Sequence, residues 1–248
     1  MISKAKLKAY ATYKSIKARD NDNIFVVEGV KMVEELLRSD FSVVDICATT
    51  EWLHCNNGVN NVTEISVSEL ERISLLQTPN QVWALAKKKT EKEIPQTIFD
   101  SLCLMLDEIK DPGNMGTILR TADWFGIENI ICSQNSVDMY NPKVVQATMG
   151  SVFRVQVYFT DLEESLLKKP LETKVYGAVL GGDNIYKKTL DNKGIILIGN
   201  ESKGISERLL PLITDKLTIP KFGSDAESLN ASVATGIICS EFCKTHIE

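Results

Sequence analysis

The sequence predicts an α/β protein of two domains, with a parallel sheet in the larger, carboxy-terminal one. After residue 98, short apolar segments alternate with helix-like segments, which is typical of βαβ units. Gly194-Ile-Ile-Leu-Ile198 is apolar throughout, and such a strand is typical of a parallel sheet that is covered on both faces. A lysine-rich run at 87–93, followed by Ile94-Pro95, is suited to a linker. We therefore expect domains at 1–90 and 98–248, joined by a linker over about 87–97.

The composition of the 248 residues is that of an ordinary globular protein, with a net charge of −5. No apolar run approaches the ~20 residues that a membrane span needs, and no signal-peptide core follows the amino terminus. The six cysteines form no Cys-x-x-Cys pair, which favours free thiols over a metal site. We expect a cytoplasmic protein with no membrane or metal partner.

The amino-terminal domain is predicted to alternate short elements. In chain order these are a helix at 3–17, a strand at 24–28, a helix at 30–38, a strand at 43–48, and strands near 62–65 and 82–86. Residues 1–19 contain six basic and no acidic side chains. Such a segment could contact RNA phosphates, although a solvated helix face would give the same pattern.

The carboxy-terminal domain is predicted to contain six strands and five helices. The strands are expected at 102–109, 128–132, 153–158, 174–180, 194–199 and 216–219, and the helices at 115–125, 141–150, 161–168, 204–213 and 228–243. Polar loops follow several of these strands, at 111–116, 199–204 and 219–228. Because ligands bind beyond the carboxyl ends of strands in open α/β sheets, these loops outline one site.

Arg120 follows the first of these loops and faces away from the apolar side of its helix, where Ile118, Ala122 and Phe125 lie. An arginine near a helix amino terminus is suited to binding phosphate, although most outward-facing arginines are simply solvated. Only His54 and His246 are present, and neither lies in the polar loops. A Ser-His or Cys-His nucleophile is therefore not expected.

Three ordered motifs carry a family resemblance. Asn114-x-Gly116-x3-Arg120, then Ile198-Gly-Asn-Glu201 with Gly204, then Ile219-Pro220 with Ser228-Leu-Asn230, resemble the motifs of SpoU-type (TrmH family) RNA 2′-O-ribose methyltransferases of the SPOUT superfamily. The resemblance covers residues 98–243. Phe25-Val-Val-Glu-Gly29 is similar to part of the RNA-binding domain, itself similar to ribosomal protein L30, that precedes the catalytic domain in this family.

The resemblance implies a SPOUT-type domain with a carboxy-terminal deep trefoil knot, a homodimer, and S-adenosylmethionine as cofactor without a metal. The residues that it assigns to cofactor binding are Leu180, Gly181, Gly199, Asn200, Ile219, Pro220 and Leu229. It also implies direct in-line transfer of the methyl group to a ribose 2′-oxygen. Arg120 would then bind the adjacent phosphate and orient the hydroxyl, because a guanidinium rarely loses its proton.

Three further residues, Asn114, Glu201 and Asn230, become candidate orienting groups, with Glu201 a candidate proton acceptor. Structured RNA is the implied substrate, and ribosomal RNA is preferred over transfer RNA. Two alternatives stay open: a non-catalytic RNA-binding protein that retains the fold, and a domain that binds another nucleotide.

Overall fold

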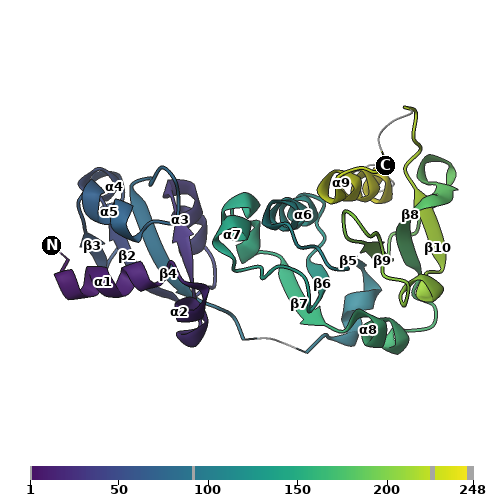
Figure 1. Cartoon of the computed structure of the whole chain (residues 1–248), viewed down its shortest axis with the longest axis horizontal. Helices are drawn as coiled ribbons and strands as arrows, with labels where there is room; N and C mark the ends of the chain where they lie inside the picture. The colour runs from purple at the N-terminus through teal and green to yellow at the C-terminus, as the bar shows by residue number, and fades with distance from the viewer. Residues whose placement is uncertain (1, 91–92, 224–226, 245–248) are drawn as a thin grey trace. The chain divides into compact units, whose positions relative to one another are not determined.

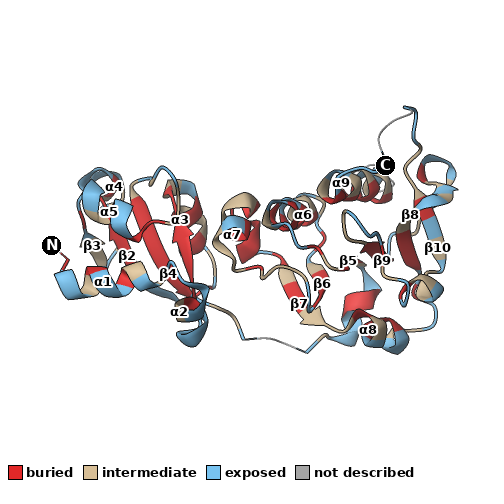
Figure 2. Cartoon of the chain, viewed as in Figure 1, coloured by how far each residue is buried: buried red, intermediate tan, exposed pale blue. Residues whose placement is uncertain are grey.

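The computed structural model describes residues 2–90, 93–223 and 227–244. The chain divides into unit 1, which is residues 1–90 with 140–153, and unit 2, which is residues 91–139 with 154–248. Each unit has its own buried strands (Figure 2). The expected domains at 1–90 and 98–248 are continuous stretches of the chain. The two units are defined by contacts in the structure, and residues 140–153 make their contacts in unit 1.

Unit 1 is built on a mixed four-stranded sheet of order β1-β4-β2-β3, in which only the β2–β3 pair is parallel. Its strands are β1 (Ile24–Glu28), β2 (Val43–Ala48), β3 (Val62–Glu64) and β4 (Val82–Lys87). Its helices are α1 (Lys4–Thr12), α2 (Ile16–Asn21), α3 (Val30–Leu37), α4 (Thr50–Cys55), α5 (Val67–Ile73) and α7 (Pro142–Thr148), with a 3-10 turn η2 (Ser151–Phe153).

The predicted single helix at 3–17 is wrong, because the chain breaks between α1 and α2. Ser15 has extended backbone angles and stands at the N-cap of α2. The extended backbone at Ser15 ends the first helical run, and a new helix starts at Ile16 although the Ser15 side chain makes no capping hydrogen bond. The Tyr13 hydroxyl, in the break, donates to Asp22 over 2.7 Å and ties the two helices together.

Two of the six basic residues at 1–19 are used inside unit 1. Lys6 pairs with Asp45 at 2.8 Å. Arg19 is 5% exposed and donates to the carbonyl of Tyr13. The exposed members of the segment are Lys4, Lys8, Lys14 and Lys17. The basic segment is therefore partly structural and partly available at the surface.

Glu28, at the end of β1, is a buried carboxylate. It accepts hydrogen bonds from the Ser74 hydroxyl and, over 2.8 Å, from the Leu75 amide. Burial raises the pKa of Glu28 above its ordinary value, although the two hydrogen bonds oppose this shift. The carboxylate thus fixes the chain after α5, and burying its charge away from water costs free energy.

We expect Glu28→Gln to remove a pH-dependent loss of stability from unit 1. A raised folded-state pKa means that the folded chain binds more protons than the unfolded chain, so the unfolding free energy falls as pH rises from about 4.5 through the folded-state value. Glutamine keeps an acceptor for Leu75 and carries no charge. Urea unfolding, followed by the fluorescence of buried Trp52 and Trp83 at about pH 5 and about pH 8, measures the effect. An identical pH dependence in both proteins would contradict it.

Unit 2 is built on a six-stranded sheet of order β10-β8-β9-β5-β6-β7, and all five strand pairs are parallel. The strands are β5 (Leu102–Leu106), β6 (Asn129–Ser133), β7 (Gln156–Thr160), β8 (Val175–Asn184), β9 (Gly194–Ile198) and β10 (Asp215–Thr218). The helices are α6 (Pro112–Trp124), α8 (Leu162–Lys168) and α9 (Ala231–Cys243), with 3-10 turns η1 (Gln96–Asp100), η3 (Ile185–Lys187) and η4 (Leu210–Leu212). The predicted α/β fold with a parallel sheet is confirmed.

Helices cover both faces of this sheet (Figure 1). α6 and α9 pack against each other on one face, and α8 lies on the other. The central strands β5 and β9 are buried along nearly their whole length, which explains their continuous apolar sequence. No helix among the described residues is both long and apolar enough to span a membrane.

Two of the predicted helices towards the carboxy terminus of unit 2 differ from the structure. The helix predicted at 204–213 is wrong: only the 3-10 turn η4 forms there, because Pro211 restricts the backbone and Ser206 bonds to Asp107 instead of capping a helix. The helix predicted at 228–243 begins at Ala231, since Asn230 is its N-cap and not part of its first turn.

Candidate functional site

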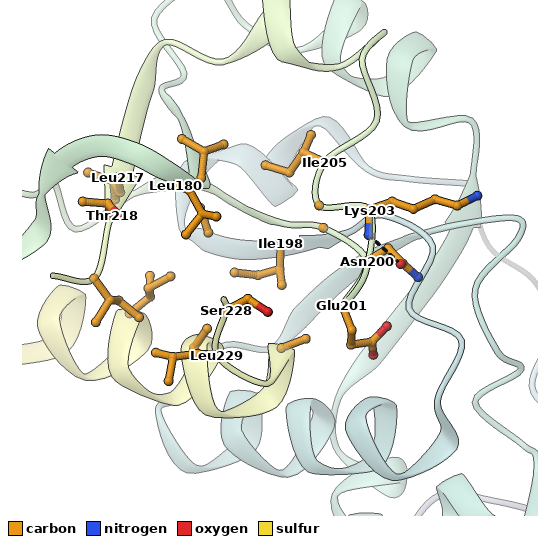
Figure 3. Close-up of a pocket in the computed structure, with 18 of the residues that line it drawn as sticks. Leu180, Ile198, Asn200, Glu201, Lys203, Ile205, Leu217, Thr218, Ser228 and Leu229 are labelled. Carbon is orange, nitrogen blue, oxygen red and sulfur yellow. Dashed lines mark hydrogen bonds between the residues drawn. The ribbon is translucent and has the colours of Figure 1, made fainter. Parts of the chain in front are cut away.

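A cavity of about 480 Å³ lies at the carboxyl ends of β8, β9 and β10 in unit 2 (Figure 3). Its walls come from four segments that are distant in sequence, at 178–180, 198–205, 217–219 and 227–229, together with Ile185 and parts of η4 and α9. Ile198, Leu217 and Leu229 give it an apolar lining, and Glu201 and Glu227 add carboxylates. This size and mixture are typical of a small-molecule site.

At residues 178–182, beside the cavity, the pairing of two parallel strands is interrupted. Lys216 of β10 pairs with Gly177 of β8, but the next residue, Leu217, pairs with Asp183. The five residues of β8 between these partners leave the ladder, and three of them line the cavity. Gly182 returns the chain to the ladder, where a Cβ atom would lie 2.7 Å from the backbone of Lys216. Only glycine permits that approach.

The amino terminus of α6 places Asn114 beside this cavity. Asp111 is the N-cap and accepts a hydrogen bond from the Asn114 amide over 2.8 Å, and Pro112 occupies the first turn. Asn114 and Gly116 are therefore inside the helix and not in a loop, because the helix begins at Pro112 and not at residue 115. Asn114 is only 8% exposed.

Three polar side chains from three motifs form one hydrogen-bonded chain. The side-chain amide of Asn230 donates to Asn114 Oδ1 over 2.8 Å, and Asn114 Nδ2 donates to Glu201 Oε1 over 2.7 Å. The orientation is fixed at one end, because Asn230 Oδ1 accepts from the Ser232 and Val233 amides at the start of α9. Each amide therefore faces one way, and Glu201 is held by a single oxygen.

The loop that carries Glu201 is fastened to the end of β5. Asn200 donates to the carbonyl of Glu108 over 2.8 Å, and buried Asp107 accepts from the amide and hydroxyl of Ser206. Asn200 also pairs with Gly204 as an isolated bridge, which closes the loop on itself. A hydrogen bond from Lys110 holds the pKa of the Glu108 carboxyl below its ordinary value. The position of Glu201 is thus fixed from both sides.

The structure brings together most, but not all, of the residues that the sequence singled out. Of the predicted cofactor residues, those that line the cavity are Leu180, Gly199, Asn200, Ile219 and Leu229. Gly181 and Pro220 do not line it, although each follows a residue that does. Arg120 is exposed on α6, does not line the cavity, and has no hydrogen bond or ion pair within the part of the chain that the structure describes.

Sequence reasoning missed two features near the site. Asp107 fastens the 199–206 loop, and its signal was an acidic residue that directly follows a buried apolar strand. Trp124 is 83% exposed on α6, one turn after Arg120, and its signal was helical spacing from that arginine. The importance of either residue can be recognised in the sequence only after the helix and strand ends are known.

Across residues 2–90, 93–223 and 227–244, no three His, Cys, Asp or Glu side chains are grouped so as to hold a metal ion. His54 lies on α4 in unit 1, and His246 lies outside the described residues.

Comparisons with known proteins identify the family of the chain. Residues 101–240 match the model of the SpoU rRNA Methylase family, and residues 4–84 match the MRM3-like substrate binding domain. The chain is 30% identical over 237 residues to the 23S rRNA (guanosine(2553)-2′-O)-methyltransferase RlmP of Bacillus subtilis, which covers 94% of each chain.

Solved structures give the same result. A proposed RNA methyltransferase of the TrmH family from Porphyromonas gingivalis has a TM-score of 0.87 at 36% identity, over 99% of each chain. An AdoMet-bound rRNA methyltransferase from Sinorhizobium meliloti has a TM-score of 0.84 at 25% identity, over 100% of this chain and 97% of its own. The chain therefore belongs to the SpoU rRNA methylase family and is an RNA methyltransferase.

Proposed function

We propose that this enzyme methylates the 2′-oxygen of a ribose in structured RNA, preferably ribosomal RNA, with S-adenosylmethionine as the donor. The observation that carries the proposal is the chain of hydrogen bonds from Asn230 through Asn114 to Glu201, which ends on the wall of the cavity. The RlmP relative, which modifies 23S rRNA and matches both units, supports ribosomal over transfer RNA.

The cavity suits S-adenosylmethionine. Its apolar side chains Ile198, Ile219 and Leu229 provide surfaces for adenine, and the closed 199–204 loop provides backbone groups for the polar parts. The carboxylates of Glu201 and Glu227 favour a cation in the same space. When bound, the cofactor supplies a methyl group on a positively charged sulfur, which the ribose 2′-oxygen takes up by direct displacement.

The side chains then have separate tasks. Glu201 keeps one oxygen that does not bond to Asn114, and this oxygen is our candidate acceptor for the 2′-hydroxyl proton. Asn114 and Asn230 orient Glu201. Arg120 binds the phosphate next to the target ribose and orients the hydroxyl, since a guanidinium matches phosphate geometry and stays charged.

Arg120 lies outside the cavity wall of its own chain, which supports a homodimer whose sites are completed across the interface. Each helix of the α6–α9 pair carries an exposed apolar side chain, Val233 on α9 and Trp124 on α6, where Trp124 follows Arg120 by one turn. A large exposed aromatic side chain is a typical interface anchor. A second copy docked there would cover Trp124 and bring its Arg120 to the partner's cavity.

We expect Trp124→Glu to convert the dimer to a monomer and to reduce methyl transfer, because a buried charge would face the partner without a counter-ion. Light scattering gives the oligomeric state, and calorimetry with S-adenosylhomocysteine shows whether the cavity remains intact. Leu171→Glu, at a side chain that is 98% exposed, is the control and should leave the dimer unchanged. A fully active monomer would remove the idea of a shared site.

Further parts of the proposal rest on the fold. The outer position of β10 beside β8, followed by a return of the chain to α6 as α9, supports a deep trefoil knot at the carboxy terminus. The mixed sheet of unit 1 and its exposed lysines support an L30-like RNA-binding domain over residues 1–90, with 98–248 as the methyltransferase domain. The six cysteines are all free, which favours a cytoplasmic location.

The test is methyl incorporation from labelled S-adenosylmethionine into RNA, with ribosomal and transfer RNA as separate substrates. Alkaline hydrolysis then identifies the product, because a 2′-O-methyl ribose blocks cleavage of the following phosphodiester whereas a methylated base does not. We expect an alkali-resistant, labelled dinucleotide from ribosomal RNA. Binding of RNA without incorporation would support the non-catalytic alternative.

A further inference from the structure

Two neighbouring strand ends beside the cavity each carry an exposed aromatic residue next to a lysine. β8 and β10 are adjacent and parallel (Figure 1), and their last paired residues are Asn184 and Thr218. The chain continues from these partners as Ile185-Tyr-Lys187 and as Ile219-Pro-Lys-Phe222. Both segments therefore leave the sheet from the same level of the ladder.

These two segments place their apolar and aromatic side chains on different sides. Ile185 and Ile219 come first and line the cavity. Tyr186 and Phe222 follow, and they are 46% and 94% exposed. We call the exposed set Tyr186, Lys187, Lys221 and Phe222 the aromatic rim, since it lies directly beyond residues of the cavity wall.

The half of the aromatic rim that follows β8 is held by polar contacts at its base. Lys188 bridges Asp183 and Asp215 at 2.8 Å each, which ties β8 to β10. The Asn184 side chain accepts from the Tyr186 amide over 3.0 Å and fixes the turn that presents Tyr186. These contacts lower the entropic cost of using that half of the rim as a binding surface.

We propose that the aromatic rim stacks unpaired bases of the RNA substrate next to the cavity, while its lysines face the phosphates. Aromatic side chains beside lysines are the pattern with which proteins hold single-stranded RNA, because each base offers a flat face and each nucleotide a charge. The proposal rests on the proposed function and adds to it that the RNA held next to the cofactor cavity is unpaired.

The binding test uses the full-length protein and a labelled single-stranded RNA of mixed sequence, about 12 nucleotides long, with its duplex for comparison. The double variant Tyr186→Ala with Phe222→Ala should bind the single strand roughly tenfold or more weakly, and should lose much less affinity for the duplex. Replacing the pair by Tyr186→Phe and Phe222→Trp should restore binding. Leu171→Ala, another exposed apolar residue of unit 2, is the matched control.

Other outcomes would overturn the inference. Equal losses on single-stranded and duplex RNA would exclude stacking. A fall in S-adenosylhomocysteine affinity would make the rim a cover for the cofactor, and a change in oligomeric state would make it a contact between copies. If the wild-type protein methylates RNA while the double variant binds single strands normally, the inference that the rim binds RNA is wrong and the proposed function stands. If the wild-type protein transfers no methyl group, the proposed function fails, and the binding comparison still decides the rim.

Discussion

Replacing Arg120 with alanine is expected to reduce methyl transfer by about 100-fold or more, because the ribose hydroxyl is no longer held against the methyl group by the contact to its phosphate. Affinity for S-adenosylhomocysteine should stay nearly unchanged, because Arg120 does not line the cavity of its own chain and is assigned to the RNA phosphate and not to the cofactor. Initial rates with saturating RNA and calorimetric titration separate the two effects. Arg208→Ala removes a guanidinium that pairs with Asp161 on the surface, and it should affect neither measurement.

A mixing experiment tells whether Arg120 acts within its own chain or across a dimer. Arg120→Ala and Gly199→Arg should each be inactive, the second because its cavity is blocked. In a mixed dimer with shared sites, the intact cavity of one chain meets the intact Arg120 of the other, so random mixing should restore up to about a quarter of the wild-type activity. No recovery from verified mixed dimers would place Arg120 in the site of its own chain.

The sheet of unit 2 could be predicted because the sequence of each central strand is by itself a sufficient signal. Leu102–Leu106 and Gly194–Ile198 are apolar without interruption, and a segment of that kind is stable only between two covered faces. Helix ends were less predictable. Asp111-Pro112 is a sequence signal for a helix start, but the helix at 204–213 failed because Ser206 found a distant partner, Asp107, that no local pattern reveals.

The candidate site shows the same division. The motif positions identify Asn114, Glu201 and Asn230 as polar residues near strand or helix ends, but not which atoms they bond. Their contacts join residues that are 87 and 116 positions apart in the chain, so they depend on the tertiary fold. The outward direction of Arg120 could be read from helical spacing. What that direction faces depends on a second molecule, which one sequence does not describe.

Gly199→Ala is expected to weaken S-adenosylhomocysteine binding roughly tenfold or more and to lower the stability of unit 2 by about 1–3 kcal/mol. A Cβ atom on Gly199 would lie 2.2 Å from the carbonyl carbon of Gly204 and 2.3 Å from the nitrogen of Ile205. These are backbone atoms of the loop that lines the cavity, so no side-chain rotation relieves the contact. The loop must open, which separates Asn200 from Gly204 and displaces Glu201.

Gly236→Ala provides the matched control, because a Cβ atom at that position in α9 meets nothing within 4 Å. Alanine is the better helix residue there by roughly 0.5–1 kcal/mol, so the control should be at least as stable as the wild type and should bind S-adenosylhomocysteine equally well. Thermal unfolding and calorimetry on both variants give the comparison. Wild-type affinity in Gly199→Ala would mean that the 199–204 loop can move aside without loss, and that its closed form is not needed for the cofactor. A loss in that variant alone ties binding to the closed loop, and so to the geometry that holds Glu201 against Asn114.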